Sequence, residues 1–178
     1  IYSLEYKSDT ISDKDLHSVI DNASKALESN DKLEDVEIMK LYYLLGIGLF
    51  RINQYDKSIE HLNITIQYGK KLFDEYYLAK AYGWNSINYL NTFSIKEYEE
   101  CFNIAENKLR YLRQYDDLAV LCTRVSCNLY RGQRSKDEIQ VVLNKAEGYL
   151  KKFESSLSAQ CYLGIGQIYS LVLNNFDA

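Results

Sequence analysis

The sequence contains no proline, only two histidines and a single tryptophan, and none of its four cysteines forms a CxxC pair. Because proline is the residue that most strongly interrupts helices, its absence leaves long helical segments unbroken. Isolated cysteines and the histidines at positions 17 and 61 do not match the ligand spacing of a zinc site. We therefore expect no metal, no cofactor and four reduced, buried cysteines in a cytoplasmic protein: Cys101, Cys122, Cys127 and Cys161.

Long hydrophobic runs and an excess of positive charge are also missing. No apolar stretch approaches the roughly 20 residues that a membrane helix needs, and no signal-peptide pattern is present. The net charge of −4 argues against direct nucleic-acid binding, which normally uses a basic face. We expect neither a membrane nor a nucleic-acid partner. Because the first residue is Ile1, we also expect the chain to be a fragment of a longer protein.

Tyrosine, in contrast, is abundant, with 17 residues. Its ring packs while its hydroxyl reaches water, so tyrosine suits half-buried positions. The frequent Lys, Asn, Ile and Tyr residues are also typical of an AT-rich genome, which suggests a low-GC bacterium.

The apolar residues follow a helical period through nearly the whole chain. Leu16, Val19, Ile20 and Ala23 show the i, i+3, i+4, i+7 pattern, and Ser12 is placed to cap their helix. Short polar clusters separate such segments, and turns this short make neighbouring helices antiparallel. We predict a linker or the end of an upstream element over residues 1–11, followed by a helical domain over residues 12–178. Its eight helices are expected at 13–29, 33–52, 54–72, 75–92, 95–113, 115–131, 135–153 and 156–174.

Residues 42–70 carry a repeat motif. The tetratricopeptide pattern is W-x2-L-G-x2-Y followed by A-x3-F. Here Tyr42 stands in the Trp place, Leu45 and Gly46 match Leu-Gly, and Leu49 takes the Tyr place. Ser58, Leu62 and Thr65 fill the small, Phe and later small positions of the second helix. This stretch resembles a tetratricopeptide repeat.

The resemblance implies an all-α, right-handed superhelical stack of antiparallel helix hairpins, with the last hairpin truncated. Tyr55 and Tyr98 look like equivalent residues of successive units and are 43 residues apart, which is longer than the usual 34-residue repeat. The array is therefore expected to be divergent, with elongated helices.

The stretch LGIG occurs twice, at 45–48 and 163–166, and looks like part of a phosphate-binding loop. A dinucleotide loop needs GxGxxG after a strand, and a P-loop needs GK[ST]; the sequence has neither. Both stretches lie inside a first helix of the predicted hairpins. We expect Gly46 to face Ser58, where two helix backbones approach closely.

No catalytic constellation is visible. His17 and His61 lie on predicted helices with no nucleophile at a suitable spacing. Carboxylates such as Asp116 and Asp117 cluster at helix starts, where they complement the helix dipole. We predict that the protein is not an enzyme.

In stacked hairpins the first helices line the concave surface, where tetratricopeptide domains bind peptides. First-helix residues suited to a peptide are asparagines, whose amides can pair with main chain, and arginines, which can hold a carboxylate. The alternative is that some of them bridge neighbouring hairpins. The candidate ligand-binding residues are Tyr43, Phe50, Asn85, Asn88, Arg124, Asn128 and Arg131; Trp84 and Asn91 lie among them.

Divergent arrays of this kind look like the regulatory regions of bacterial signalling proteins. The resemblance implies a regulatory or sensor module that binds a peptide or a partner protein. The alternative is a self-association scaffold that dimerises an attached output domain, such as a DNA-binding or cyclase domain. An apolar patch on an end helix would favour that alternative.

Overall fold

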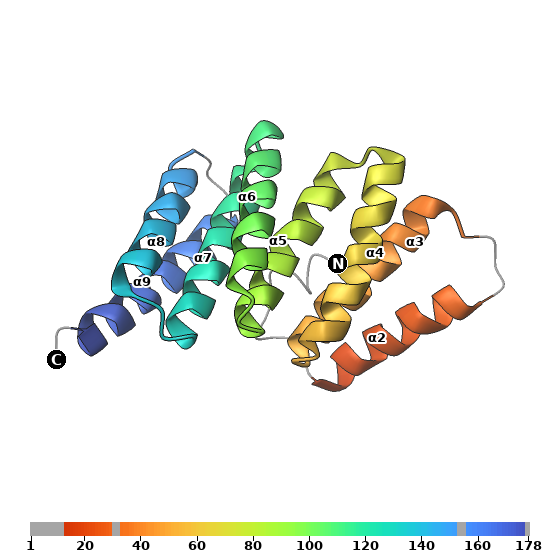
Figure 1. Ribbon diagram of the computed structural model, residues 1–178, viewed down its shortest axis with the longest axis horizontal. Coiled ribbons are helices and arrows are strands. Elements are labelled where there is room, and N and C mark those ends of the chain that lie inside the picture. Colours follow the sequence, from red (N-terminus) through yellow and green to blue (C-terminus); the bar gives the residue numbers. More distant parts are fainter. Residues whose placement is uncertain (1–12, 30–32, 153–155, 177–178) are drawn as a thin grey trace.

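Two layers of antiparallel helices make up the computed structural model, which describes residues 13–29, 33–152 and 156–176 (Figure 1). Within these residues the chain forms eight helices and no strand, which confirms the predicted all-α class and a stack of helix hairpins. The expected linker over 1–11 and the Ser12 cap lie outside the described residues. The helices are α2 (Asp13–Glu28), α3 (Asp35–Arg51), α4 (Tyr55–Leu72), α5 (Glu75–Asn91), α6 (Ile95–Tyr111), α7 (Tyr115–Arg131), α8 (Lys136–Leu150) and α9 (Ser156–Phe176).

Local side-chain contacts explain several helix starts. At α5 the Asp74 carboxylate accepts a hydrogen bond from the backbone N–H of Tyr77 at 3.0 Å. At α8 the hydroxyl of Ser135 accepts from the N–H of Glu138, whose carboxylate accepts from the N–H of Ser135. These are the reciprocal bonds of a capping box, and they satisfy donors that have no partner within the helix.

Five turns share one backbone conformation. Each turn between consecutive helices from α3 to α8 contains one residue at φ between 54° and 60°, and these residues are spaced 20 apart: Asn53, Phe73, Phe93, Arg113 and Gln133. In each turn the residue after the left-handed one donates its backbone N–H to the carbonyl five residues before it. An example is the bond from Gln54 to Leu49 at 2.9 Å. This is the Schellman closure of a helix end. The helices therefore recur every 20 residues and the hairpins every 40.

The 40-residue period corrects the register expected from the sequence. Tyr55 opens α4 and Ile95 opens α6, so these two residues are structurally equivalent. Tyr98, which the sequence pairs with Tyr55, lies almost one turn inside α6. Tyrosine is so frequent in this sequence that a match between two tyrosines does not identify equivalent positions. The left-handed turn residues do identify them, because they recur every 20 residues.

The odd-numbered helices α3, α5, α7 and α9 form one layer and the even-numbered helices the other. Between hairpins, α3 contacts α5, α5 contacts α7 and α7 contacts α9. No pair of even-numbered helices makes a comparable contact among the described residues. Neighbouring hairpins therefore meet through the odd-numbered layer.

Gly46 lies at a close helix crossing, as expected. The Ser58 hydroxyl donates to its carbonyl oxygen at 2.7 Å, and a Cβ on Gly46 would lie 2.6 Å from Cγ of Leu62. The first LGIG stretch thus serves helix packing between α3 and α4.

Candidate functional site

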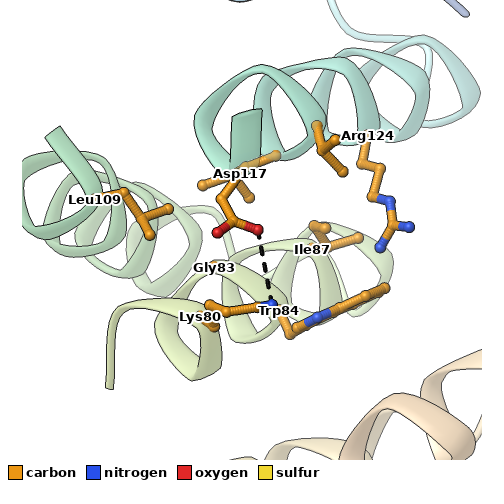
Figure 2. Close-up of a pocket in the computed structure, with 9 residues that line it drawn as sticks. Lys80, Gly83, Trp84, Ile87, Leu109, Asp117 and Arg124 are labelled. Atoms are coloured by element: carbon orange, nitrogen blue, oxygen red, sulfur yellow. Dashed lines mark ion pairs between the residues drawn. The ribbon is translucent and has the colours of Figure 1, made fainter. Parts of the chain in front are cut away.

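A small pocket lies between α5 and α7, two neighbouring helices of the odd-numbered layer (Figure 2). Four lining residues of each helix follow the i, i+3, i+4, i+7 spacing that puts side chains on one face. The cavity volume is ≈ 40 Å³, which accommodates a water or a small side-chain group. The lining residues are Lys80, Gly83, Trp84 and Ile87 from α5, Asp117, Val120, Leu121 and Arg124 from α7, and Leu109 from α6.

Most of the pocket wall is apolar. A Cβ at Gly83 would lie 3.4 Å from Cδ1 of Leu121, an ordinary van der Waals distance, so α5 and α7 are in contact there. Leu109, which is buried, contributes from α6. An aliphatic group that entered the pocket would therefore be removed from water on several sides.

A charged pair lines the same pocket. Nζ of Lys80 lies 3.7 Å from Oδ1 of Asp117, and both side chains are about nine-tenths buried. The Tyr76 hydroxyl donates to Oδ2 of Asp117 at 2.9 Å and accepts from Lys80 at 3.3 Å. The pair is thus held by hydrogen bonds, as buried charges require. Asp117 was expected only to complement the helix dipole; it also joins α7 to α5.

Trp84 and Arg124 line the rest of the pocket. The guanidinium carbon of Arg124 lies 4.4 Å from the ring centre of Trp84, a cation–π contact between α7 and α5. The indole N–H donates to the Tyr43 hydroxyl at 3.2 Å, and the Phe50 ring centre lies 5.1 Å from that of Trp84. The indole orientation is therefore fixed by residues of α3.

The structure gathers three of the seven predicted residues around Trp84. Arg124 lines the pocket, whereas Phe50 and Tyr43 pack behind the indole. Tyr43 is fully buried and so supports the pocket without being able to touch a ligand.

Asn85 and Asn88 require a correction, since both side chains are buried between α5 and α4. Asn85 donates to the side chain of Asn63, and Asn88 donates to the hydroxyl of Ser58. Their positions on α5 point both side chains toward α4, so they link the α3–α4 hairpin to α5. Neither side chain is accessible to a groove ligand.

Asn128 bridges as well, because its oxygen accepts from Asn91 of α5 at 3.0 Å and its amide donates to the carbonyl of Arg124. It also lines a second hollow of ≈ 280 Å³. That hollow lies at the turn ends of the hairpins, beside Phe93 and Gly132. Arg131 is exposed at the end of α7 and is not part of either lining.

Sequence reasoning missed Lys80, Asp117 and Tyr76. A usable signal was present, because Lys80 lies between the buried apolar residues Ala79 and Ala81. A charged residue on an apolar helix face normally has a partner.

The described residues offer few reactive groups. Burial raises the pKa of the Cys101 thiol to about 11 and also raises the pKa of Cys127. Both thiols stay protonated near neutral pH, and the thiolate is the reactive form. No group of three His, Cys, Asp or Glu side chains could hold a metal ion among the residues searched. The geometry suits binding of a side chain by burial and charge.

Comparisons with family models, curated proteins and solved structures found no match for this chain. Within the described part of the chain, no helix has the length and apolar character needed to cross a membrane.

Proposed function

We propose that this chain is a non-catalytic regulatory module that binds a peptide, or a peptide segment of a partner protein, on its odd-numbered layer. The pocket between α5 and α7 is the observation that supports this proposal most directly. Its cavity of ≈ 40 Å³ is too small for a cofactor or a drug-sized ligand, which usually occupies ~300 Å³ or more. It suits one anchoring side chain of a longer ligand.

The chemistry of the lining suggests what the anchor is. Ile87, Val120 and Leu121 suit an aliphatic group, and Arg124 offers a planar guanidinium beside that group. Such a guanidinium can bind a carboxylate through two parallel hydrogen bonds. The proposed ligand is therefore a peptide with an aliphatic residue close to an acidic side chain or to its carboxyl terminus.

Repeat architecture supports the wider assignment. The Gly46–Ser58 contact occurs where tetratricopeptide hairpins place their small residues, although the 40-residue period exceeds the usual 34. We accordingly propose a divergent tetratricopeptide-type array from the cytoplasmic regulatory region of a bacterial signalling protein. Its ligand would control an attached output domain.

The single tryptophan gives a direct test, because Trp84 lines the pocket. The probes are synthetic heptapeptide pools with free carboxyl termini, each with one residue type fixed at one position. We expect pools with an aliphatic residue next to an acidic residue, or at the carboxyl end, to shift the tryptophan emission. Other pools should leave the emission unchanged.

Two variants on α7 supply matched controls. Arg124→Ala should weaken the selected peptide by about tenfold or more, the scale of a lost charged hydrogen bond. Arg131→Ala removes the same charge from the same helix outside the pocket and should bind as the wild type does. Equal binding by both variants, or the absence of any responding pool, would disprove the assignment of this pocket.

Self-association is the second candidate function. It is favoured by a different observation, the three exposed large hydrophobic residues of α9: Tyr162, Leu163 and Leu171.

A further inference from the structure

A second hollow lies along the same seam as the pocket, at the edge of the stack where α5 and α7 end. The α5–α6 and α7–α8 turns lie beside each other at this edge (Figure 1). Further helices pack on these two hairpins, α4 on α5 and α9 on α7 and α8, so the hollow belongs to the middle of the stack. We call it the turn hollow; its volume is ≈ 280 Å³, and it is lined by Leu90, Phe93, Ile95, Asn128, Gly132 and Arg134.

The pocket and the turn hollow follow one another along the same helix faces. On α5, Leu90 of the turn hollow comes three residues after Ile87 of the pocket. On α7, Asn128 comes four residues after Arg124. Residues three or four apart lie on one side of a helix. A ligand seated in the pocket can therefore continue into the turn hollow.

A hydrogen-bonded asparagine pair crosses the seam between the two cavities. The side-chain amide of Asn91 donates to the side-chain oxygen of Asn128 at 3.0 Å and to the carbonyl oxygen of Ile87 at 2.8 Å. Asn91 is half-buried, and its own side-chain oxygen accepts from no other residue in the described part of the chain. That oxygen can accept a main-chain N–H of a peptide that passes from one cavity to the other.

We propose that the peptide ligand binds through two anchors: an aliphatic side chain in the pocket and an aromatic side chain in the turn hollow, with an acidic residue between them. This inference rests on the proposed peptide binding. It adds the second anchor, the spacing of the anchors and the position of the acidic residue.

Size and lining select an aromatic side chain for the turn hollow. An apolar cavity of about 150 Å³ takes up benzene, so ≈ 280 Å³ is enough for an aromatic ring. The Phe93 ring is 77% exposed and can pack against a second ring. Arg134 donates through Nε and Nη2 to the carboxylate of Glu138 at 3.2 and 2.6 Å, which fixes the plane of its guanidinium. A flat guanidinium stacks on aromatic faces, a contact that an aliphatic side chain would not use.

The separation of the two cavities sets the spacing of the anchors. On the α7 side, the residues that line the pocket precede those that line the turn hollow by about ten positions, or about 15 Å along a helix. An extended peptide rises about 3.3 Å per residue, so this distance corresponds to about four or five residues of the ligand.

Arg124 places the acidic group between the anchors. Figure 2 shows Lys80 and Asp117 at one end of the pocket and Arg124 at the other, and the Arg124 end is the one followed by Asn128 of the turn hollow. A carboxylate that Arg124 binds thus belongs to the segment that connects the anchors. The lining of the two cavities also contains more cations than acids, because Lys80, Arg124 and Arg134 face the single acid Asp117, although the whole chain has a net charge of −4. This local charge favours an acidic connecting segment.

Peptide titrations monitored by the emission of Trp84 test the second anchor. The probes are synthetic peptides with acetylated and amidated ends that contain one leucine, an adjacent aspartate and otherwise serine or glycine. In further peptides a single phenylalanine is placed at each separation from the leucine, on either side. We expect phenylalanine about four or five residues from the leucine, on the side of the aspartate, to tighten binding about tenfold, the scale of burying one aromatic side chain. Shorter separations, and phenylalanine on the other side, should add nothing.

Two exposed phenylalanines supply matched variants. Both occupy left-handed turn positions, but Phe93 lines the turn hollow whereas Phe73, 86% exposed, lines neither cavity. Phe93→Ala should lose the gain from the second anchor and bind the peptide without phenylalanine as the wild type does. Phe73→Ala should keep the gain. A gain that Phe93→Ala retains in full would overturn the placement of the aromatic anchor.

The peptide series on the wild type also separates the two proposals. Binding of the leucine–aspartate peptide with no gain from phenylalanine at any separation would overturn the second anchor and leave the proposed peptide binding in place. A lack of binding by every peptide of the series would overturn both.

Discussion

Gly46 illustrates how one missing side chain sets the distance between two helices. Its Cβ position lies 2.6 Å from Cγ of Leu62, a fully buried residue. We expect Gly46→Ala to lower the free energy of unfolding by about 1–3 kcal/mol, because the core around Leu62 must shift. Urea denaturation measures the change.

Gly148 supplies the matched control, because it lies on α8 with nothing within 4 Å of its Cβ position. There Gly148→Ala should raise the free energy of unfolding by up to ~1 kcal/mol through helix propensity alone. If both alanines stabilised the protein equally, the crossing at Gly46 would not be tight.

Glu106 is a buried carboxylate that links α6 to α8 through hydrogen bonds. Burial alone would raise its pKa, but hydrogen bonds from Lys145 and Tyr149 and the charge of Arg110 lower it below the usual value. Lys145 Nζ and the Tyr149 hydroxyl lie 2.8 and 2.6 Å from its two oxygens. These contacts join α6 to α8, and the backbones of these two described helices do not pack closely on each other.

The sign of the pH effect follows from the lowered pKa. A group with a lower pKa in the folded state stabilises above its unfolded pKa, here 4.5, and loses that contribution as the pH falls through the folded value. We expect Glu106→Gln to cost about 1–2 kcal/mol at pH 7. The difference in unfolding free energy between the two proteins should shrink as the pH falls below 4.5. A constant difference down to pH 3 would exclude Glu106 as the titrating group.

For the seven candidate binding residues, the sequence did not predict which neighbouring helix each side chain faces. Arg124 lies in the pocket, but Asn85 and Asn88 are buried against α4. One residue corresponds to about 100° of rotation on a helix. A sequence shows that a polar residue is on a first helix; it does not show which neighbour that residue faces until the register is known.

At the scale of elements, the helices themselves were largely predictable. Their apolar period and polar breaks placed all eight within a few residues, because short turns and the absence of proline leave little choice. The five left-handed turn residues were not predictable, since none is glycine and two are phenylalanine. Tertiary packing of the helix ends holds these residues in a conformation that costs an L-residue roughly 1–2 kcal/mol.

Phe73 tests that cost. It has φ of 54° and is 86% exposed, so its side chain contributes little packing. We expect Phe73→Gly to raise the melting temperature, with a net gain of about 0.5–1 kcal/mol after the entropy of glycine in the unfolded chain. Phe73→Ala removes the ring and keeps the strain, so it should give no gain. Equal stabilisation by both variants would show that the exposed ring, not the backbone, is unfavourable.

At the scale of the whole molecule, contacts run mainly from each helix to its neighbours along the stack. Adjacent helices pack on one another, and hairpins meet through the odd-numbered layer. Proteins built in this way have a stability that is approximately a sum of units and of the interfaces between neighbours. The pocket between α5 and α7 therefore belongs to the middle of the stack and does not require the last helix.

Deletion of residues 154–178 tests this description. It removes α9, which contacts only α7 and α8 to a comparable extent among the described residues. We expect the shortened protein to keep its helical circular dichroism spectrum, and to unfold at lower urea concentration with a smaller denaturant slope, since less surface is buried. The emission of Trp84 should be unchanged, because α9 does not line its pocket. Loss of all helical signal would instead indicate a closed bundle, in which every helix is needed to complete one core.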